Sequence, residues 1–241
     1  MILQAALNGA RDASFHPGVP LSVEQVVKSA VAAVGAGANE LHVHIRDDRG
    51  DESLNPQAVD AMIGALHAAL PGTLIGINSG GWIENDDMRR LEHIVAWRNI
   101  PDHASVNIDE AGAIDLGMAL HRRGIGIEAG LSSIDDAIKF VESPLAPLVL
   151  RILVEPDIQD LDRAMETARE IIARMSLSPN RKPILLHGFN ETVWPFIREA
   201  CRMRCSTRVG FEDTKILPDG REAQSNAELI GAAIEMKRLL V

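Results

Sequence analysis

Short apolar runs alternate along the whole chain with longer stretches in which apolar residues recur at helical spacing. Runs of about four to eight apolar residues predict buried strands, and the longer periodic stretches predict amphipathic helices. A helix is expected to follow each strand, which is typical of a parallel β/α protein. The expected strands lie within residues 2–7, 40–45, 73–77, 103–108, 124–127, 148–154, 183–186 and 207–211.

Start signals mark three of the predicted helices. In each, a serine is followed three residues later by an acid or amide, the pattern of a capping box. No Pro/Gly/Ser-rich linker or low-complexity tract divides the repeating units. We therefore predict one α/β domain over residues 1–241, a (β/α)8 TIM barrel, with an open doubly wound sheet as the alternative. The capping pairs are Ser22 with Gln25, Ser133 with Asp136, and Ser225 with Glu228.

Polar residues recur where the predicted strands end. In a barrel these ends meet at one rim, and active sites lie there. Regular polar strand ends therefore favour the barrel and indicate which side chains surround its site. These residues are Asn8, His42, His44, Asn78, Ser79, Asn107, Asp109, Glu128, Glu155, His187, Glu212 and Asp213.

His42 and His44 are two residues apart in an apolar strand, so their side chains project from one face and are able to hold one metal ion. The last strand closes beside the first, which brings Glu212 and Asp213 near them. Strand alternation turns these two acids in different directions, so one is expected as a ligand and the other as a base. The structural alternatives are histidines satisfied by core hydrogen bonds and acids in a solvated turn or helix cap.

Composition excludes several classes of protein. A net charge of −10 argues against a nucleic-acid partner, which requires concentrated positive charge. Only two cysteines occur, Cys201 and Cys205, which indicates reduced thiols and no disulfide framework. No basic segment followed by a long apolar run begins the chain, and no apolar stretch is long enough to cross a membrane. We expect a cytoplasmic protein with no membrane partner.

Several motifs in this order resemble those of the β-keto acid cleavage enzymes, and the resemblance covers nearly the whole chain. Each motif alone has little specificity, but their combination is specific. The motifs are Leu7-Asn8-Gly9-Ala10, Gly35-Ala36-Gly37-Ala38, His42-Val43-His44-Ile45-Arg46-Asp47, Asn78-Ser79-Gly80-Gly81, Ala104-Ser105-Val106-Asn107, Arg208-Val209-Gly210-Phe211-Glu212-Asp213 and Ser225-Asn226-Ala227-Glu228.

The resemblance implies a zinc ion held by His42, His44 and Glu212, with Asp213 as general base and Arg208 beside it. It also implies an exchange in which a β-keto acid and acetyl-CoA give acetoacetate and a new acyl-CoA. A homotetramer is implied as well. Zinc with three protein ligands keeps positions open for a keto acid, although Mn²⁺ and Co²⁺ suit the same ligand types.

Substrate contacts are predicted for four further residues. The resemblance implies Ser79 and Glu128 in the substrate pocket, and we add their neighbours at the rim, Gly80 and Asn107. The alternatives are a tight turn at residues 79–81, a structural acid at Glu128 and, for Arg208, a salt bridge that fills the barrel.

Two departures from the family pattern keep other functions open. Arg11 stands where the family has an acid, and the chain is short for the family. A CoA-independent, metal-assisted aldolase or hydrolase is therefore one alternative. A non-catalytic barrel that binds a metal or a small molecule is the other.

Overall fold

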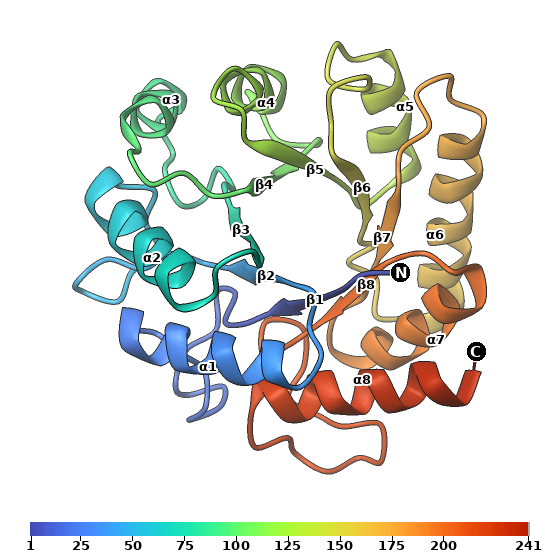
Figure 1. The fold of residues 1–241 in the computed structure, drawn as a ribbon. Helices are drawn as coiled ribbons and strands as arrows, with labels where there is room; N and C mark the ends of the chain where they lie inside the picture. Colours follow the sequence, from blue (N-terminus) through green and yellow to red (C-terminus); the bar gives the residue numbers. More distant parts are fainter. Residues whose placement is uncertain (241) are drawn as a thin grey trace.

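A computed structural model describes residues 1–240 as eight parallel strands surrounded by helices (Figure 1). The hydrogen-bonded order is β7-β6-β5-β4-β3-β2-β1-β8, and a parallel bridge between Leu185 and Ser206 links the two end strands into a nearly closed barrel. The predicted TIM barrel is therefore confirmed. The strands are β1 (Leu3–Ala6), β2 (Glu40–Val43), β3 (Leu74–Asn78), β4 (His103–Asn107), β5 (Gly126–Leu131), β6 (Arg151–Val154), β7 (Ile184–Leu186) and β8 (Thr207–Val209).

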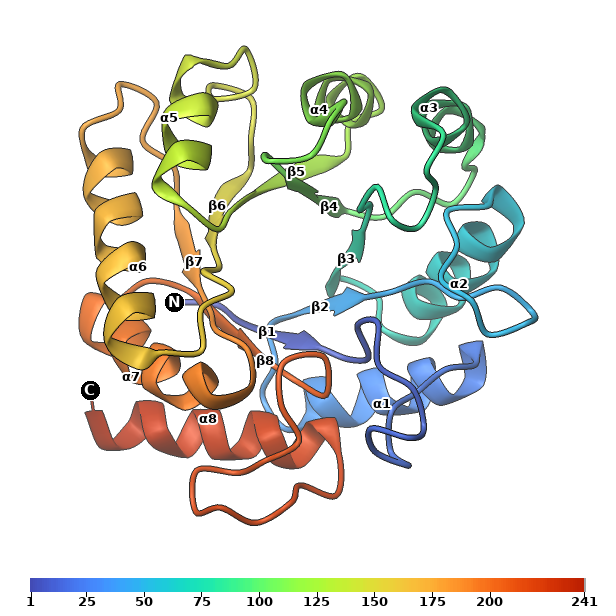
Figure 2. The same cartoon turned by 180° about the vertical axis from the view of Figure 1, so that it is seen from behind.

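The helices form an outer ring, and α8 lies beside α1, so that the two ends of the sequence pack together (Figures 1 and 2). None of the helices within residues 1–240 is both long and apolar enough to cross a membrane. The helices are α1 (Val23–Gly35), α2 (Pro56–Ala69), α3 (Asp87–Ala96), α4 (Ala113–Arg122), α5 (Ile134–Glu142), α6 (Leu161–Ser176), α7 (Val193–Met203) and α8 (Asn226–Leu240), with a short 3₁₀ turn at Asn190–Thr192.

Two of the three predicted capping boxes are complete in the structure, and the third forms only one of its two hydrogen bonds. Complete capping boxes begin α1 at Ser22 and α5 at Ser133. Before α8, the Ser225 hydroxyl accepts a hydrogen bond from the backbone N–H of Glu228 at 3.2 Å. The Glu228 carboxylate accepts from the N–H of Gln224 at 2.7 Å instead of from Ser225. This third box is displaced by one residue because the acid reaches further back along the chain.

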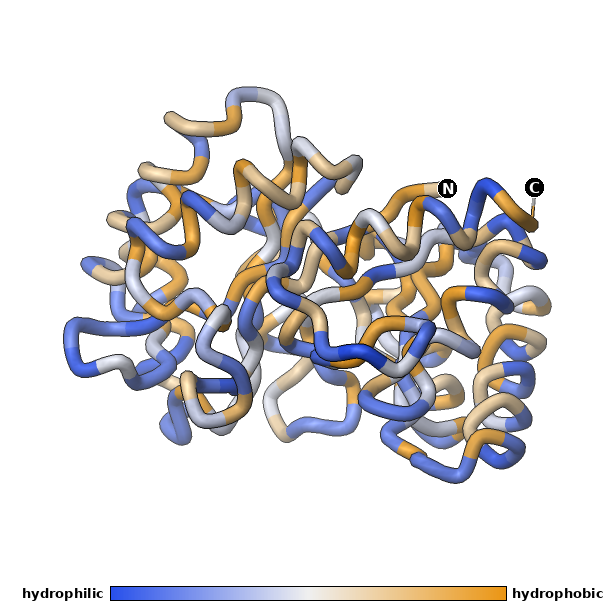
Figure 3. Tube along the Cα trace, turned by 90° about the horizontal axis from the view of Figure 1, so that it is seen from below, coloured by the Kyte–Doolittle hydropathy of each residue, from blue (hydrophilic) through white to orange (hydrophobic). Residues whose placement is uncertain are grey.

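Apolar side chains fill the space between strands and helices, and the core is mostly Val, Ile, Leu and Ala, as expected for a chain with 3% aromatic residues. Figure 3 shows hydrophilic stretches on the protruding loops and alternating hydrophobic and hydrophilic segments along the helices. Trp97 is 2% exposed, and its indole N–H donates to the carbonyl of Leu54 at 3.0 Å, which satisfies the ring's one polar group.

A cluster of buried polar side chains lies inside the barrel, and we call it the inner network. Arg151 Nε donates to Glu128 at 2.6 Å, and the same guanidinium also contacts Glu40. Gln4 Nε2 donates to Glu40 at 2.9 Å and to Glu128 at 3.1 Å, and His103 Nε2 lies 3.6 Å from Glu128. Burial disfavours the charged carboxylate, but His103 and Arg151 outweigh it and lower the pKa of Glu128 to about 2. The inner network consists of Gln4, Glu40, His103, Glu128 and Arg151.

Candidate active site

A cavity of about 510 Å³ opens at the C-terminal ends of the strands. This is the rim where barrel enzymes hold their active sites. A wider hollow of about 790 Å³ lies between the outer faces of α6 and α7, but none of the predicted site residues borders it. The rim cavity is lined by Ala10, Arg11, His42, His44, Asn78, Trp82, Ser105, Asn107, Asp109, Gly130, Ser132, Leu153, Glu155, Asp157, Phe189, Asn190, Arg208 and Glu212.

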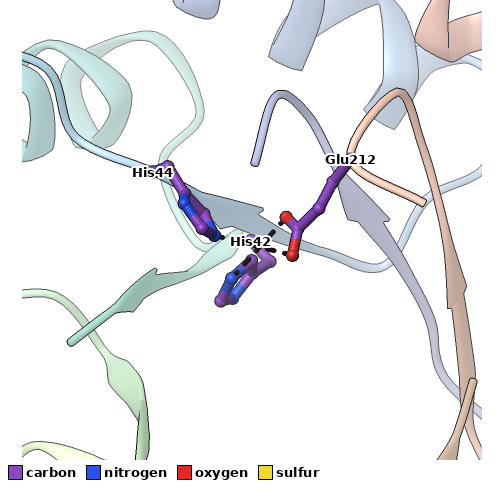
Figure 4. A group of neighbouring side chains, drawn as sticks. All are labelled: His42, His44 and Glu212. Carbon is purple, nitrogen blue, oxygen red and sulfur yellow. Dashed lines mark ion pairs between the residues drawn. The ribbon is translucent and has the colours of Figure 1, made fainter. Parts of the chain in front are cut away.

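The three predicted metal ligands meet in this cavity (Figure 4). His42 Nε2 lies 3.8 Å from one carboxylate oxygen of Glu212, and His44 Nε2 lies 3.5 Å from the other. Both histidines come from the same side of the β2 segment because they are two residues apart. Glu212 reaches them from a turn after β8, where the N–H groups of Asp213 and Thr214 donate to the carbonyl of Gly210.

The loop after β1 leaves space for Glu212 to approach the two histidines. Gly9 has φ +55°, and a Cβ atom there would lie 2.4 Å from Cγ of Glu212. Only glycine permits both that conformation and that approach. The neighbouring Asn8 side chain donates to the carbonyl of His44 at 3.0 Å and accepts from its N–H at 2.9 Å. The end of β1 therefore fixes the backbone of His44 and admits Glu212.

The two histidines differ in protonation. Burial lowers the pKa of His42 to about 3, so its imidazole is neutral. Burial also acts against a charged His44, but Glu212 and Glu52 outweigh it and raise the pKa of His44 to about 9. The Nδ1 atom of His44 makes a hydrogen bond with a carboxylate oxygen of Glu52. Its Nε2 atom faces Glu212 and lies 3.1 Å from the amide nitrogen of Asn78.

These donors fit a divalent metal ion. Two imidazoles and one carboxylate are ligands that zinc accepts, and the donor separations of 3.5 and 3.8 Å are those of ligands around one ion. The Oε2 atom of Glu212 is buried and has no hydrogen-bond partner among the described residues, as expected for an atom reserved for a ligand. Glu52 behind His44 matches the carboxylate that commonly orients a metal-binding histidine.

Arg208 links the metal ligands to the predicted base. Its Nη2 atom donates to Glu212 at 2.7 Å and to Asp213 at 2.9 Å. Burial raises the pKa of Asp213 to about 6, with Arg208 acting in the opposite direction. Asp213 is fully buried and does not line the cavity, whereas Arg208 does. We call His42, His44, Arg208, Glu212 and Asp213 the rim cluster.

The predicted substrate residues divide into two sets. Asn107 lines the cavity, but Ser79, Gly80 and Glu128 do not. The Ser79 hydroxyl donates to the carbonyl of Ser105 at 2.6 Å, and the Gly80 N–H donates to the Asn78 side chain at 2.8 Å. Glu128 belongs to the inner network, one inward-facing position before Gly130, which does border the cavity. In this structure these three residues support the cavity from behind its lining.

Arg11, at the position where an acid was expected, also borders the cavity. Its guanidinium donates to the carbonyl of Glu212 at 3.4 Å and to the Asn190 side chain at 3.0 Å, and it lies over the ring of Phe15. Arg11 therefore adds positive charge beside Arg208 instead of neutralising it.

Glu155 and His187, named only as rim residues from the sequence, form a pair. His187 Nε2 lies 3.0 Å from the Glu155 carboxylate, and His187 Nδ1 lies 3.9 Å from Asp213. Burial raises the pKa of Glu155 to about 8 despite Arg208. Two contributors had no signal in the sequence: Glu52, which orients His44, and Trp82, whose indole N–H donates to Glu52 at 3.2 Å.

The barrel is similar to known structures. The apo structure of ObcA matches 91% of this chain with a TM-score of 0.73 and 14% sequence identity. The chain spans 61% of the ObcA chain. At this identity the likeness concerns the fold alone.

Sequence comparisons identify relatives and a family. The 3-keto-5-aminohexanoate cleavage enzyme of Acetoanaerobium sticklandii is 24% identical over 253 residues, covering 99% of this chain and 92% of that protein. The 3-oxoadipate:acetyl-CoA acetyltransferase of Cupriavidus necator is 31% identical over 84 residues, covering 33% of this chain and 28% of that protein. The family described as beta-keto acid cleavage enzyme matches residues 1–137 and 152–240.

Proposed function

Because this chain belongs to the beta-keto acid cleavage enzyme family, whose members cleave carbon–carbon bonds, we propose that it exchanges a β-keto acid with acetyl-CoA in a zinc-dependent reaction. The products are acetoacetate and a new acyl-CoA. The observation that carries this proposal is the convergence of His42, His44 and Glu212 on one cavity, next to Arg208 and Asp213. The names of the two relatives above also support a keto acid and acetyl-CoA as substrates.

His42, His44 and Glu212 would hold the ion. When bound, a divalent ion supplies Lewis acidity at the ketone of the substrate, which acidifies its α-proton. Asp213 would accept that proton from C2 of the keto acid, and Arg208 would keep the carboxylate oriented through the contact at 2.9 Å. Arg11 and Arg208, both cationic and both at the cavity, would attract the substrate carboxylate.

Each bond formed in the proposed exchange is matched by a bond broken, and Asp213 regains its starting state. C2 of the keto acid loses a proton to Asp213 and forms a bond to the acetyl carbon of acetyl-CoA. CoA sulfur then moves to the original ketone carbon, and the bond between C2 and C3 breaks. Asp213 returns its proton to C2 of the departing acetoacetate, so the base is ready for another cycle. The homotetramer and the cytoplasmic location stay predictions.

Metal analysis combined with an acetoacetate assay tests the proposal. The purified chain should contain one zinc ion per subunit and form acetoacetate from a β-keto acid only when acetyl-CoA is added. His42→Ala should lose both properties. His121→Ala, which removes an exposed histidine at the end of α4, is the matched control and should keep both. Turnover without acetyl-CoA would support the aldolase or hydrolase instead, and absence of metal would refute the site.

The relatives leave the far end of the substrate undecided. One is named for a keto acid that carries an amine, and the other for 3-oxoadipate, which carries a second carboxylate. These ends have opposite charges at neutral pH. The residues that line the cavity of this chain must therefore discriminate between them.

A further inference from the structure

Trp82 is a large aromatic residue at the cavity whose side chain does not pack into the core. It lies in the loop after β3, borders the rim cavity and is 52% exposed. Among residues 1–240, its neighbour Ile83 is one of the apolar side chains that pack against the core, and Trp82 is not. Its indole N–H donates to Oε2 of Glu52 at 3.2 Å. This hydrogen bond, and not burial, is the specific contact that the side chain makes.

Each carboxylate oxygen of Glu52 has one partner. Oε1 makes a hydrogen bond with Nδ1 of His44, and Oε2 accepts from Trp82. Glu52 pairs with His44 and, within residues 1–240, with no lysine or arginine. The guanidinium of Arg46 donates to backbone carbonyls instead. The backbone of Glu52 is fixed by its bridge to Arg46, but that bridge does not fix the carboxylate. Trp82 is therefore the contact that holds one oxygen while the other meets His44.

The loop after β3 holds the indole in this place. A turn in which the N–H of Ile83 donates to the carbonyl of Gly80 carries Trp82 at its third position. The ring lies over Gly80, where a Cβ atom would be 2.3 Å from Cζ3 of the indole. Gly80 does not have a positive φ, so glycine is required there by space and not by conformation. The end of β3 also carries Asn78, whose amide nitrogen lies 3.1 Å from Nε2 of His44. This segment therefore reaches His44 both directly and through the indole.

A metal-binding histidine is oriented by the group that holds its second ring nitrogen, and loss of that group weakens metal binding. Glu52 holds His44 in this way, and Trp82 holds Glu52. We infer that Trp82 is a positioning residue of the metal centre, whose indole N–H orients Glu52 and through it the imidazole of His44. This role requires no contact between Trp82 and the ion. The inference rests on the metal site of the proposed function, and it gives Gly80 the task of leaving space for the ring.

The zinc affinities of two phenylalanine variants test this role. Trp82→Phe keeps an aromatic ring at the cavity but removes the N–H, and it should weaken zinc binding by about threefold to tenfold. Trp194→Phe is the matched control, because its indole N–H donates to the carbonyl of Ile216 at 2.7 Å and its side chain borders the hollow outside α6 and α7. This control should keep the wild-type affinity. Competition with a chelator, without substrate, gives each value, and equal affinities of Trp82→Phe and the wild type would overturn the inference.

A double variant separates positioning through Glu52 from a general effect of the ring. Glu52→Ala removes the carboxylate that joins the indole to His44. Adding Trp82→Phe to Glu52→Ala should then weaken zinc binding by less than about twofold further, because the contact is already lost. The same fold-change in both backgrounds would show that Trp82 does not act through Glu52 and would overturn the inference. Circular dichroism of the zinc-free variants should match that of the wild type, since the half-exposed ring packs on no core residue.

Failure of this inference is distinguishable from failure of the proposed function. The affinities are measured without substrate, so they do not depend on the reaction. If the wild type binds zinc but forms no acetoacetate with acetyl-CoA, the proposed reaction fails and the affinities of the variants still decide the role of Trp82. If the wild type binds no zinc, the metal site and the inference fail together.

Discussion

The inner network and the rim cluster use the same chemical groups in two neighbouring layers of one barrel, yet the cavity at the strand ends is lined by four residues of the rim cluster and by none of the inner network. Glu40, His103 and Glu128 lie within a spacing that one metal ion could bridge, as do the ligands at the rim. Arg151 already contacts both carboxylates of the inner set, whose side chains are fully buried.

At the rim the arginine leaves more of the carboxylate free. Arg208 bonds to one oxygen of Glu212, and the other oxygen has no partner and faces His42. Ligand spacing alone therefore does not distinguish a metal site from a structural ion-pair cluster. Access to a cavity and a carboxylate oxygen that no arginine occupies are the features that separate the two layers.

The largest contrast is expected from the same substitution in each layer. Glu212→Gln should lose bound zinc and lower kcat/KM by roughly 10³-fold, because an amide is a weak metal ligand and the transition state loses about 4 kcal/mol. Glu128→Gln should retain stoichiometric zinc. Metal analysis and kinetics on both variants check this, and loss of zinc from Glu128→Gln alone would reverse our assignment of the two layers.

Removing the arginine of the inner network should destabilise the fold. Arg151→Met leaves Glu40 and Glu128 buried without a cation, which costs about 3–5 kcal/mol. Urea unfolding monitored by circular dichroism measures the loss. Arg169→Met is the control, because the exposed Arg169 guanidinium on α6 lies 3.7 Å from Glu199 on α7 and its loss should change stability by less than about 1 kcal/mol. Equal stability of Arg151→Met and the wild type would show that the inner network is not held by its charges.

Glu52→Gln should weaken zinc binding by about 10- to 100-fold, since it removes the carboxylate that orients His44. Competition with a chelator gives the affinity. Glu84→Gln serves as the matched control: Glu84 lies in the loop after β3, pairs with Arg89 at 3.6 Å and accepts from the N–H of Asp86 at 3.2 Å. An unaltered affinity in Glu52→Gln would mean that the strand and Asn8 suffice to position the imidazole.

The two layers should also respond differently to acid. The pKa of Asp213 is raised to about 6, and a base must be ionised, so kcat/KM should fall about tenfold per pH unit below that value. The pKa of Glu128 is lowered from 4.5 to about 2, so its contribution to stability is complete above pH 4.5 and is lost only as the pH falls toward 2. Activity and circular dichroism recorded over the same pH series should separate; simultaneous loss would contradict this.

Much of the architecture could be predicted from the sequence because apolar runs of strand length and helical periodicity repeat without interruption. The histidine pair was also predictable, since alternation along β2 determines its geometry. The position of Glu128 inside the barrel, below the cavity, was not predictable. The predicted strand ended at Ile127, whereas β5 continues to Leu131, which moves Glu128 from the rim to the interior. Every second residue of a strand points into the barrel, so an error of a few residues in a strand boundary places a side chain in the wrong layer.

Other contributors depend on contacts that no local pattern encodes. Glu52 reaches His44 because its loop folds back to pair with Arg46 in an isolated antiparallel bridge. Gly130 has no room for a side chain because Glu155 and Asn107 approach it from the strands on either side. Both features follow from the tertiary arrangement of loops, and periodicity describes only the elements between them.

The close contact of Gly9 with Glu212 has a consequence for the order of events during synthesis. The histidines leave the ribosome early, but their carboxylate partner is near the other end of the chain and arrives only when β8 pairs with β1. A partly made chain therefore presents two imidazoles without the acid that completes the set. High-affinity metal capture should coincide with closure of the barrel, which makes the bound ion a marker of finished molecules.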